Sequence, residues 1–423
     1  MRLTSFIPAV LILSLSGPVD AQNPAAVVPF TIQVPDSVLL DLKERLSRAR
    51  FADEIPGVEW DYGTNLAYLK GLTDYWRDTY DWRAEERRLN GFDQFKTRID
   101  GLEIHFIHQR STSPNARPLL LLNGWPSSLV EYTRVIGPLT DPVPYGGRVE
   151  DSFHVVIPVM PGFGFSDKPR ERGYDAERMA ALWAELMARL GYTSYAVHGS
   201  DWGSGIAHRL ALRDAAHVTA VHLAGCPGAP APAAPSANAG SAARGPAPGP
   251  NATVNQAHNL GYQEIQSTRP QTLGHLLSDS PVGLASWIVE KWFAWSDHNG
   301  DMDEVFTKDE ILTNIMFYWV TNTGASSARL YYENRHLDGR LMPTPFTRPD
   351  ARVMAPTGCG AFPRQYDRRN TPVNTDSAAA RAGAETRYNV VHFTTMPRGG
   401  HFPALEVPDL WLADLRSFFS ELR

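Results

Sequence analysis

The stretch Val197-His198-Gly199-Ser200-Asp201-Trp202-Gly203-Ser204 constrains the fold more tightly than any other part of this chain. It ends a short apolar run and precedes helix-forming residues 206–212, so the order predicts a strand, a sharp turn and a helix. Gly199 and Gly203 lie two residues before and two residues after Asp201. A nucleophile elbow needs small residues at these positions, because its strained turn brings the backbone close to neighbouring segments.

Asp201, rather than Ser200, occupies the nucleophile position of this predicted elbow. Ser200 would have His198 and Trp202 at the two flanking positions, and both side chains are too large. A carboxylate nucleophile forms an ester with an alkyl carbon, so it suits epoxides and alkyl halides. Taken alone, the stretch is also compatible with an ordinary strand-to-helix turn in which Asp201 caps the helix.

Length and charge limit the classes of protein that this chain can form. Its 423 residues suffice for one large α/β domain with additions, or for two domains. The formal net charge of −6 gives no basic surface for binding nucleic acid.

Residues 1–21 have the pattern of a secretory signal peptide, with a charged start at Arg2, a short apolar core and a small-residue cleavage site at residues 19–21. We expect a secreted or periplasmic protein with no integral membrane span after cleavage, and an uncleaved anchor is the alternative. In an oxidising compartment Cys226 and Cys359 could pair or remain free.

Short apolar runs alternate with helical segments along most of the remaining chain, which is typical of a parallel α/β sheet. The predicted strands are Lys96–Ile99 and Leu102–Gln109, joined by a hairpin turn, then Leu119–Leu122, Phe153–Val159, Ser194–Val197, Thr219–Leu223, Arg352–Ala355 and Asn389–Thr395. The predicted helices include Val38–Leu46, Tyr68–Tyr80, Ala176–Leu190 and Leu410–Leu422.

Two segments interrupt this alternation and define the expected domains. Residues 227–252 consist almost wholly of Ala, Pro, Gly and Ser, so we expect a flexible loop. Residues 253–345 are helical and aromatic, and their place between two core strands predicts a cap over the carboxyl edge of the sheet, where ligands bind. The core then comprises residues 96–226 and 346–423, and residues 22–95 form an N-terminal extension.

Two further motifs stand where a hydrolase site around Asp201 requires them. Asn123-Gly124-Trp125-Pro126 follows a predicted strand, and its turn can aim a backbone N–H at the nucleophile, forming an oxyanion hole with the N–H of Trp202. His401, in Gly399-Gly400-His401-Phe402, follows the last strand, and the chain order in such hydrolases is nucleophile, acid, histidine. Each motif alone is also compatible with a plain turn or a structural histidine.

With these motifs the sequence resembles the epoxide hydrolases of the microsomal and juvenile-hormone type, within the α/β-hydrolase superfamily. The resemblance extends from about Val28 to the C-terminus. It is carried in chain order by Arg45-Leu46, Tyr75-Trp76, Tyr80-Asp81-Trp82-Arg83, Asn123-Gly124-Trp125-Pro126, Pro161-Gly162-Phe163-Gly164-Phe165-Ser166, Asp201-Trp202-Gly203, Asp279-Ser280-Pro281-Val282-Gly283-Leu284, Tyr331-Tyr332-Glu333-Asn334 and Gly399-Gly400-His401-Phe402. It implies an α/β-hydrolase fold, with a mostly parallel sheet, helices on both faces, a helical cap inserted between core strands and an N-terminal extension.

The resemblance also implies a role for each site residue. Asp201 attacks one carbon of a small hydrophobic epoxide, and Tyr262 and Tyr331 of the cap donate hydrogen bonds to the epoxide oxygen. His401 then activates water to hydrolyse the ester, while the two backbone N–H groups hold the oxyanion. The expected product is a vicinal diol, formed without a metal or an organic cofactor, and a part in detoxification is expected with it.

The chain departs from the family pattern at the acid that orients the histidine. The family places Asp or Glu at the end of a Phe-Pro-x-acid stretch, which here is Phe362-Pro363-Arg364-Gln365. Gln365 can orient the ring by hydrogen bonding, but it cannot stabilise an imidazolium. Asp367 is the nearest carboxylate, so either residue could occupy the relay position. The oxyanion turn also begins with Asn123 where the family usually has His, and its backbone donors are expected to survive.

Two other functions are compatible with the sequence. A haloalkane dehalogenase also uses an Asp followed by Trp, but it would need halide-binding donors in place of the two cap tyrosines and would not need residues 28–95. The second is a catalytically weak binding protein for hydrophobic epoxides. Gln365 suggests this function, because an amide at the relay position cannot stabilise an imidazolium.

Overall fold

The computed structural model describes residues 26–226, 260–337, 340–342, 351–364 and 377–422. The predicted signal peptide and the predicted loop at 227–252 lie outside these ranges. In the part of the chain that is described, no helix has the length and apolar character needed to cross a membrane.

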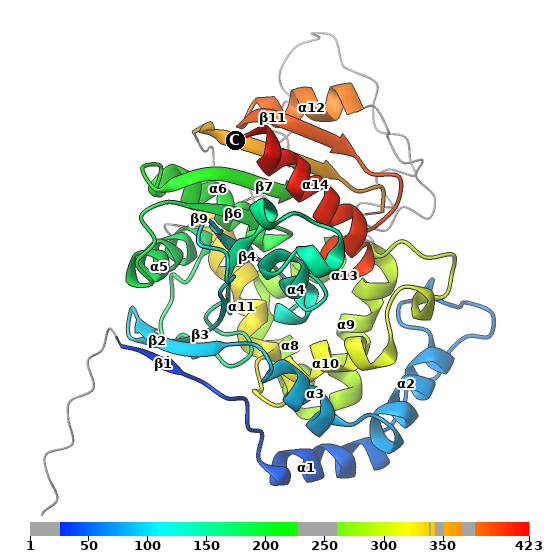
Figure 1. Ribbon diagram of the computed structural model, residues 1–423. Helices are drawn as coiled ribbons and strands as arrows, with labels where there is room; N and C mark the ends of the chain where they lie inside the picture. Colours follow the sequence, from blue (N-terminus) through cyan, green and yellow to red (C-terminus); the bar gives the residue numbers. More distant parts are fainter. Residues whose placement is uncertain (1–25, 227–259, 338–339, 343–350, 365–376, 423) are drawn as a thin grey trace, which may run out of the picture.

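Within the described residues, nine strands form one sheet in the order β1-β2-β3-β5-β4-β6-β7-β10-β11 (Figure 1). Their bounds are β1 (Val27–Pro29), β2 (Gln94–Ile99), β3 (Leu102–Gln109), β4 (Arg117–Leu122), β5 (Phe153–Pro158), β6 (Tyr195–Gly199), β7 (Val218–Ala224), β10 (Val353–Ala361) and β11 (Tyr388–Thr395). The pairs β1–β2, β2–β3 and β3–β5 are antiparallel, and the remaining neighbours from β5 to β11 are parallel. The predicted mostly parallel sheet is confirmed.

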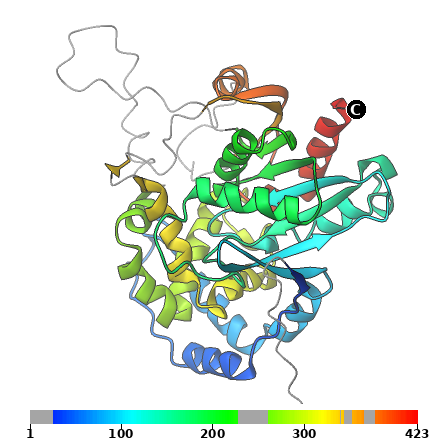
Figure 2. The same cartoon turned by 90° about the vertical axis from the view of Figure 1, so that its left-hand side faces the viewer.

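Helices cover both faces of this sheet. α5 (Ala176–Arg189) and α6 (Trp202–Arg213) pack together on one face, and α4 (Ile136–Thr140) and α14 (Pro408–Glu421) lie on the other (Figure 1, Figure 2). A strand that is covered on both faces needs apolar side chains at consecutive positions. Accordingly, Leu119, Leu120 and Leu121 of β4 are all fully buried. The shorter elements of the core are η1 (Leu129–Tyr132), η2 (Val143–Tyr145), η3 (Val149–Asp151), α12 (Ser377–Glu385) and α13 (Pro403–Glu406).

The strand predicted at Arg352–Ala355 is longer than expected and continues to Ala361. The segment that sequence patterning missed is rich in glycine, which usually interrupts a strand. Here β10 pairs with β7 on one side and β11 on the other. A Cβ on Gly358 would lie 2.7 Å from the Phe418 ring of α14, so close packing by that helix explains the glycine.

The cap follows β7 in the chain and precedes β10. It contains a helical segment at residues 260–268, then α8 (Pro270–Asp279), α9 (Pro281–Trp295), η4 (Met302–Glu304), α10 (Lys308–Trp319), α11 (Gly324–Arg335) and the small hairpin of β8 (His336–Leu337) and β9 (Arg340–Leu341). α10 is fixed to the core because Arg134 forms a two-point ion pair with Glu310, with both N–O distances at 2.7 Å.

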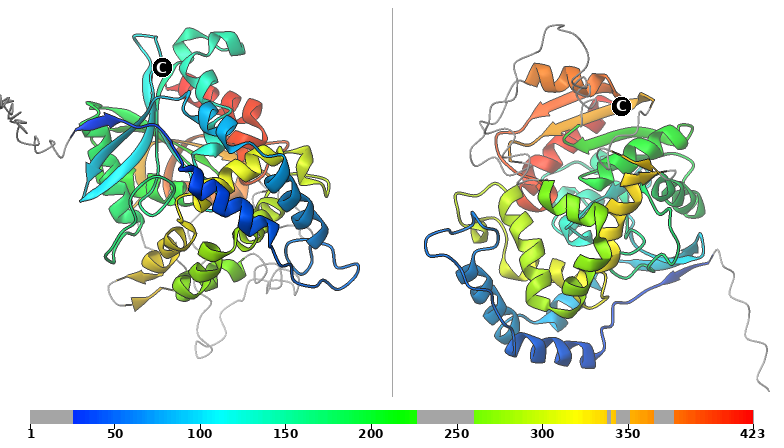
Figure 3. Two further views of the ribbon diagram at one scale, coloured as in Figure 1. Left: turned by 90° about the horizontal axis from the view of Figure 1, so that it is seen from below. Right: turned by 180° about the vertical axis from the view of Figure 1, so that it is seen from behind.

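The N-terminal extension wraps around the outside of the cap helices, as Figure 3 shows for α1 (Asp36–Ser47) and α2 (Leu66–Asp78). Three of its tyrosines hydrogen-bond to side chains of the cap: Tyr68 to Asp303 at 2.8 Å, Tyr75 to Asp309 at 3.0 Å and Tyr80 to Thr313 at 2.9 Å. Sequence patterning missed α3 (Trp82–Leu89), a short and strongly charged helix whose N-cap Asp81 accepts from the backbone of Ala84. The extension therefore holds the cap in place from outside.

A disulfide bond joins Cys226, just after β7, to Cys359 in β10, with their Cα atoms 5.5 Å apart. The two cysteines therefore pair, which was one of the two alternatives left by the sequence. The bond links the strands before and after the cap, so it closes the base of the inserted segment.

Candidate active site

Asp201 stands at the turn between β6 and α6, with φ at 48° and ψ at −123°. This conformation costs a residue with a side chain of order 1–3 kcal/mol and persists only where the surroundings impose it. A Cβ on Gly203 would lie 2.0 Å from the Leu122 carbonyl oxygen, and one on Gly199 would lie 2.5 Å from the Gly203 carbonyl oxygen. The predicted order of strand, sharp turn and helix is confirmed, and these close approaches explain why both positions hold glycine.

The turn after β4 meets the elbow at the Asp201 carboxylate. The backbone N–H of Trp125 donates to Oδ1 of Asp201 at 2.9 Å. Gly124 allows this approach, because a Cβ there would lie 2.0 Å from Oδ1. The Trp125–Pro126 peptide bond is cis. Trp202, the other predicted source of an oxyanion N–H, is the first residue of α6 and directly follows Asp201.

His401 faces the other oxygen of the same carboxylate. Its Nε2 lies 3.3 Å from Oδ2 of Asp201, and its backbone N–H donates to the carbonyl of Trp295, the last residue of α9, at 2.8 Å. Burial acts to lower the pKa of His401, but Asp201 and, more weakly, Glu131 and Glu406 outweigh it and raise that pKa above its usual value.

The two predicted cap tyrosines come together from separate helical segments. The hydroxyl of Tyr331, on α11, donates to that of Tyr262, in the 260–268 segment, at 3.3 Å. The ring of Trp125 stacks on Tyr262 with centroids 5.2 Å apart, and Trp202 meets Tyr331 edge-on at 4.9 Å. Burial raises the pKa of Tyr331 well above its usual range, so this phenol keeps its proton.

Three buried residues with ionisable side chains lie in this region, and no sequence motif marks them as part of the site. Lys291 of α9 places its Nζ 4.8 Å from the ring centroid of Tyr262, within range of a cation–π interaction. Burial raises the pKa of Glu131 and of Glu406 to about 7 in each case. Their roles depend on contacts between residues far apart in the chain, which a single sequence does not display.

Both residues predicted for the relay position, Gln365 and Asp367, lie outside the described residues. The preceding Arg364 is described, and its backbone N–H donates to the Gly399 carbonyl at 3.1 Å. The chain therefore passes beside the loop that carries His401 just before the predicted relay segment begins.

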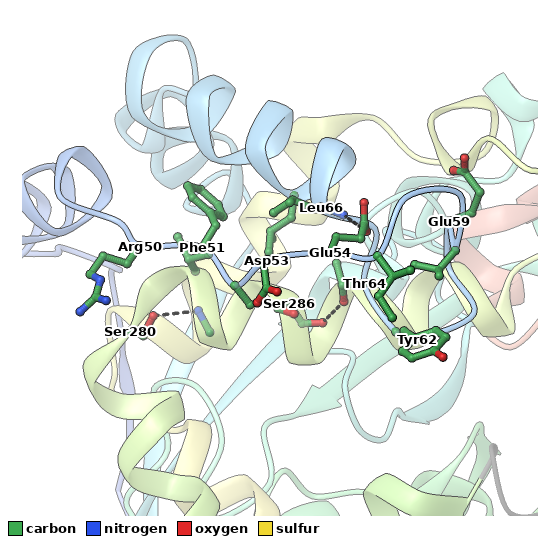
Figure 4. Close-up of a pocket in the computed structure, with 17 residues that line it drawn as sticks. Arg50, Phe51, Asp53, Glu54, Glu59, Tyr62, Thr64, Leu66, Ser280 and Ser286 are labelled. Carbon is green, nitrogen blue, oxygen red and sulfur yellow. Dashed lines mark hydrogen bonds between the residues drawn. The ribbon is translucent and has the colours of Figure 1, made fainter.

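No group of three or more His, Cys, Asp or Glu side chains in the described ranges is arranged to hold a metal ion. A separate cavity of about 420 Å³ lies between the extension and α9 (Figure 4). On its wall Thr64 donates to the Ser286 carbonyl at 2.7 Å, and none of the predicted site residues lines it. This cavity therefore belongs to the junction of extension and cap.

The fold defines the class, an α/β hydrolase, and Asp201 stands at the turn between β6 and α6. Family models agree: one described as "Epoxide hydrolase N terminus" matches residues 27–132, and one described as "alpha/beta hydrolase fold" matches residues 117–247.

The chain is also similar to individual proteins over nearly its whole length. "Epoxide hydrolase 1" of Sus scrofa is 34% identical over 96% of this chain and 91% of its own. The crystal structure of juvenile hormone epoxide hydrolase from Bombyx mori has a TM-score of 0.77 at 29% identity, covering 94% of each chain. The Aspergillus niger epoxide hydrolase structure has a TM-score of 0.76 at 30% identity, covering 94% of this chain and 97% of that one. The chain belongs to the epoxide hydrolase family.

We expect Gly203→Ala to destabilise the protein, because its Cβ would overlap the backbone of β4. Overpacking of this kind costs about 1–3 kcal/mol or more, measurable as a lower free energy of unfolding in urea. Gly205→Ala is the matched control, since its Cβ would meet only Arg209 at an ordinary 3.8 Å. Equal stability of the two variants would contradict the packing described for the elbow.

Proposed function

We propose that this protein adds water to an epoxide to give a vicinal diol, through a covalent ester on Asp201. The observation that carries the proposal is the division of the Asp201 carboxylate between two partners. Oδ1 accepts the N–H of Trp125 at 2.9 Å, and Oδ2 faces His401 at 3.3 Å. One carboxylate therefore provides both the attacking oxygen and the oxygen that becomes the oxyanion. The two buried phenols of the cap belong to the same site.

In the first step Oδ2 of Asp201 attacks an epoxide carbon, because Oδ1 is occupied by the Trp125 N–H. A new C–O bond forms, the epoxide C–O bond breaks, and its electron pair stays on the epoxide oxygen. The hydroxyls of Tyr262 and Tyr331 are 3.3 Å apart, close enough for both to donate to that one oxygen. Paired phenols favour an epoxide over an alkyl halide as the substrate, since the charge to be stabilised is on oxygen.

In the second step the ester is hydrolysed. His401 takes a proton from water, the water oxygen attacks Cγ of Asp201, and the charge that develops on Oδ1 is held by the N–H groups of Trp125 and Trp202. The tetrahedral intermediate then collapses: the bond between Cγ and the ester oxygen breaks, and that oxygen takes the proton from His401. The second proton of the water leaves the Asp201 carboxyl group and neutralises the alkoxide formed in the first step, so the diol leaves and the carboxylate is regenerated. Either Gln365 or Asp367 acts as the relay residue in this proposal.

The His401→Gln variant is expected to accumulate the ester, because no base remains to activate water. Mass spectrometry after addition of a small epoxide should find the Asp201 peptide heavier by the mass of the substrate. Asp201→Ala, which lacks the nucleophile, is the control and should show neither adduct nor turnover. An unmodified Asp201 peptide in a His401→Gln protein that still binds substrate would refute the ester.

Removing either phenol hydroxyl should slow ester formation. Loss of one donor to a developing oxyanion typically costs on the order of 10²–10³ in rate, and Tyr262→Phe and Tyr331→Phe should each fall in this range. Single-turnover measurements isolate the alkylation step from hydrolysis. A wild-type alkylation rate in either variant would exclude that tyrosine from the reaction.

We further infer that the protein is exported and acts outside the cytoplasm, where a role in detoxification would be exercised on incoming epoxides. The Cys226–Cys359 disulfide supports an oxidising compartment, and the pattern of residues 1–21 supports a cleaved signal. N-terminal sequencing of the exported protein should then begin at Gln22, whereas a retained Met1 would contradict cleavage.

A further inference from the structure

Glu131, in the 3₁₀ helix η1, lies under the junction of the two loops that form the candidate active site. Its side chain is buried, and each of its carboxylate oxygens accepts one hydrogen bond. Oε2 accepts from the hydroxyl of Ser127 at 2.6 Å, and Oε1 accepts from the hydroxyl of Ser200 at 2.9 Å.

The two serines belong to the two loops that meet at the nucleophile. Ser127 immediately follows the oxyanion turn, and its hydroxyl also lies 3.2 Å from the Gly124 carbonyl, which it can donate to in place of Glu131. Ser200 immediately precedes Asp201 on the elbow. Glu131 therefore connects the turn that carries the Trp125 N–H to the residue beside the nucleophile.

Burying a carboxylate costs free energy that burying an apolar side chain does not, so the presence of Glu131 at this position calls for a reason. Cap helix α10 closes the same region, since the Tyr318 hydroxyl donates to the Ser127 carbonyl at 2.6 Å and Asn314 donates to the Pro126 carbonyl at 2.8 Å. The turn and the residue after it are therefore held by neutral donors of the cap, Asn314 and Tyr318. They are also held by the Glu131 carboxylate, which contacts the elbow as well.

We propose that Glu131 is a positioning residue, which ties the oxyanion turn to the nucleophile elbow through Ser127 and Ser200. The proposal rests on the ester mechanism proposed above. Its first consequence is geometric, since the N–H of Trp125 keeps its aim at Oδ1 only while the two loops hold their separation.

The second consequence is electrostatic. The carboxylates that raise the pKa of His401 are Asp201, Glu131 and Glu406. Around Glu131, burial raises its pKa to about 7, His401 opposes that shift and Asp201 adds to it. The neighbouring phenols of Tyr132 and Tyr318 have pKa values raised well above their usual range by burial, so they stay neutral. Loss of the Glu131 charge should therefore lower the pKa of His401.

The test follows the decay of the alkyl-enzyme in single turnovers across a range of pH. Ester decay requires neutral His401, so it rises with pH through the histidine pKa. In Glu131→Gln, which keeps the shape and loses the charge, the midpoint of this rise should move to lower pH. In Glu131→Ala, which also loses the connection between the loops, decay should slow by about 10- to 100-fold.

Ser127→Ala and Ser200→Ala each remove one arm of the connection and keep the carboxylate, so they serve if a Glu131 variant fails to fold. Both should slow ester decay. The matched control is Glu86→Gln, another buried glutamate, which accepts from the Val34 N–H at 2.7 Å in the extension and should leave the midpoint unmoved.

An unmoved midpoint in Glu131→Gln, an equal shift in Glu86→Gln, or wild-type decay in both serine variants would each overturn the role of Glu131. Failure of the wild-type protein to form any ester would overturn the proposed function instead, so the two failures are distinguishable.

Discussion

The strained backbone at Asp201 is the constraint on which the rest of the site depends. A residue at φ 48° between a strand and a helix is stable only if the segments on both sides are fixed, and here β6 lies within the sheet and α6 packs against it. β4 and β6 are parallel neighbours in which Leu122 pairs with Gly199, so their two turns leave the sheet side by side. That register brings the Trp125 N–H to Asp201 across 76 residues of sequence. Gly124, Gly199 and Gly203 are needed because the backbone segments of the two turns approach one another so closely.

The cap supplies the two phenol hydroxyls of the candidate site, and the extension holds the cap in position. Tyr262 and Tyr331 come from helical segments that are inserted between β7 and β10, and an insertion can shift relative to its core. Three restraints oppose such a shift: the Arg134–Glu310 ion pair, the cap contacts to the oxyanion turn, and the tyrosines of α2 and the following turn that grip the cap from outside. This explains in physical terms why the extension accompanies a cap that carries the two phenols of the proposed mechanism.

The parts of the structure that the sequence predicted are those set by local pattern. The elbow at Asp201 is specified by two glycines at fixed offsets, and the strands by apolar runs, so both were recoverable. β1 was missed because three residues at a sheet edge carry no periodicity, and the end of β10 because its glycines are explained only by Phe418 of α14. Glu131 was missed for a stronger reason, since its partner Ser200 is 69 residues away and nothing in the residues around it marks a buried carboxylate.

Charge in this buried site changes during the proposed reaction, and that change favours the second step, the hydrolysis of the ester. In the free enzyme the ionised Asp201 raises the pKa of His401 and, with burial, helps to raise that of Glu131. When Asp201 becomes an ester its charge disappears, and with it the largest influence that keeps the imidazole protonated. The pKa of His401 then falls at the point where a neutral base is needed. The remaining carboxylates, Glu131 and Glu406, can stabilise the imidazolium that forms when water is deprotonated, because the attraction between unlike charges is strong where water is excluded. A site with one carboxylate fewer would have the nucleophile and the base but less compensation for the charge that the second step creates.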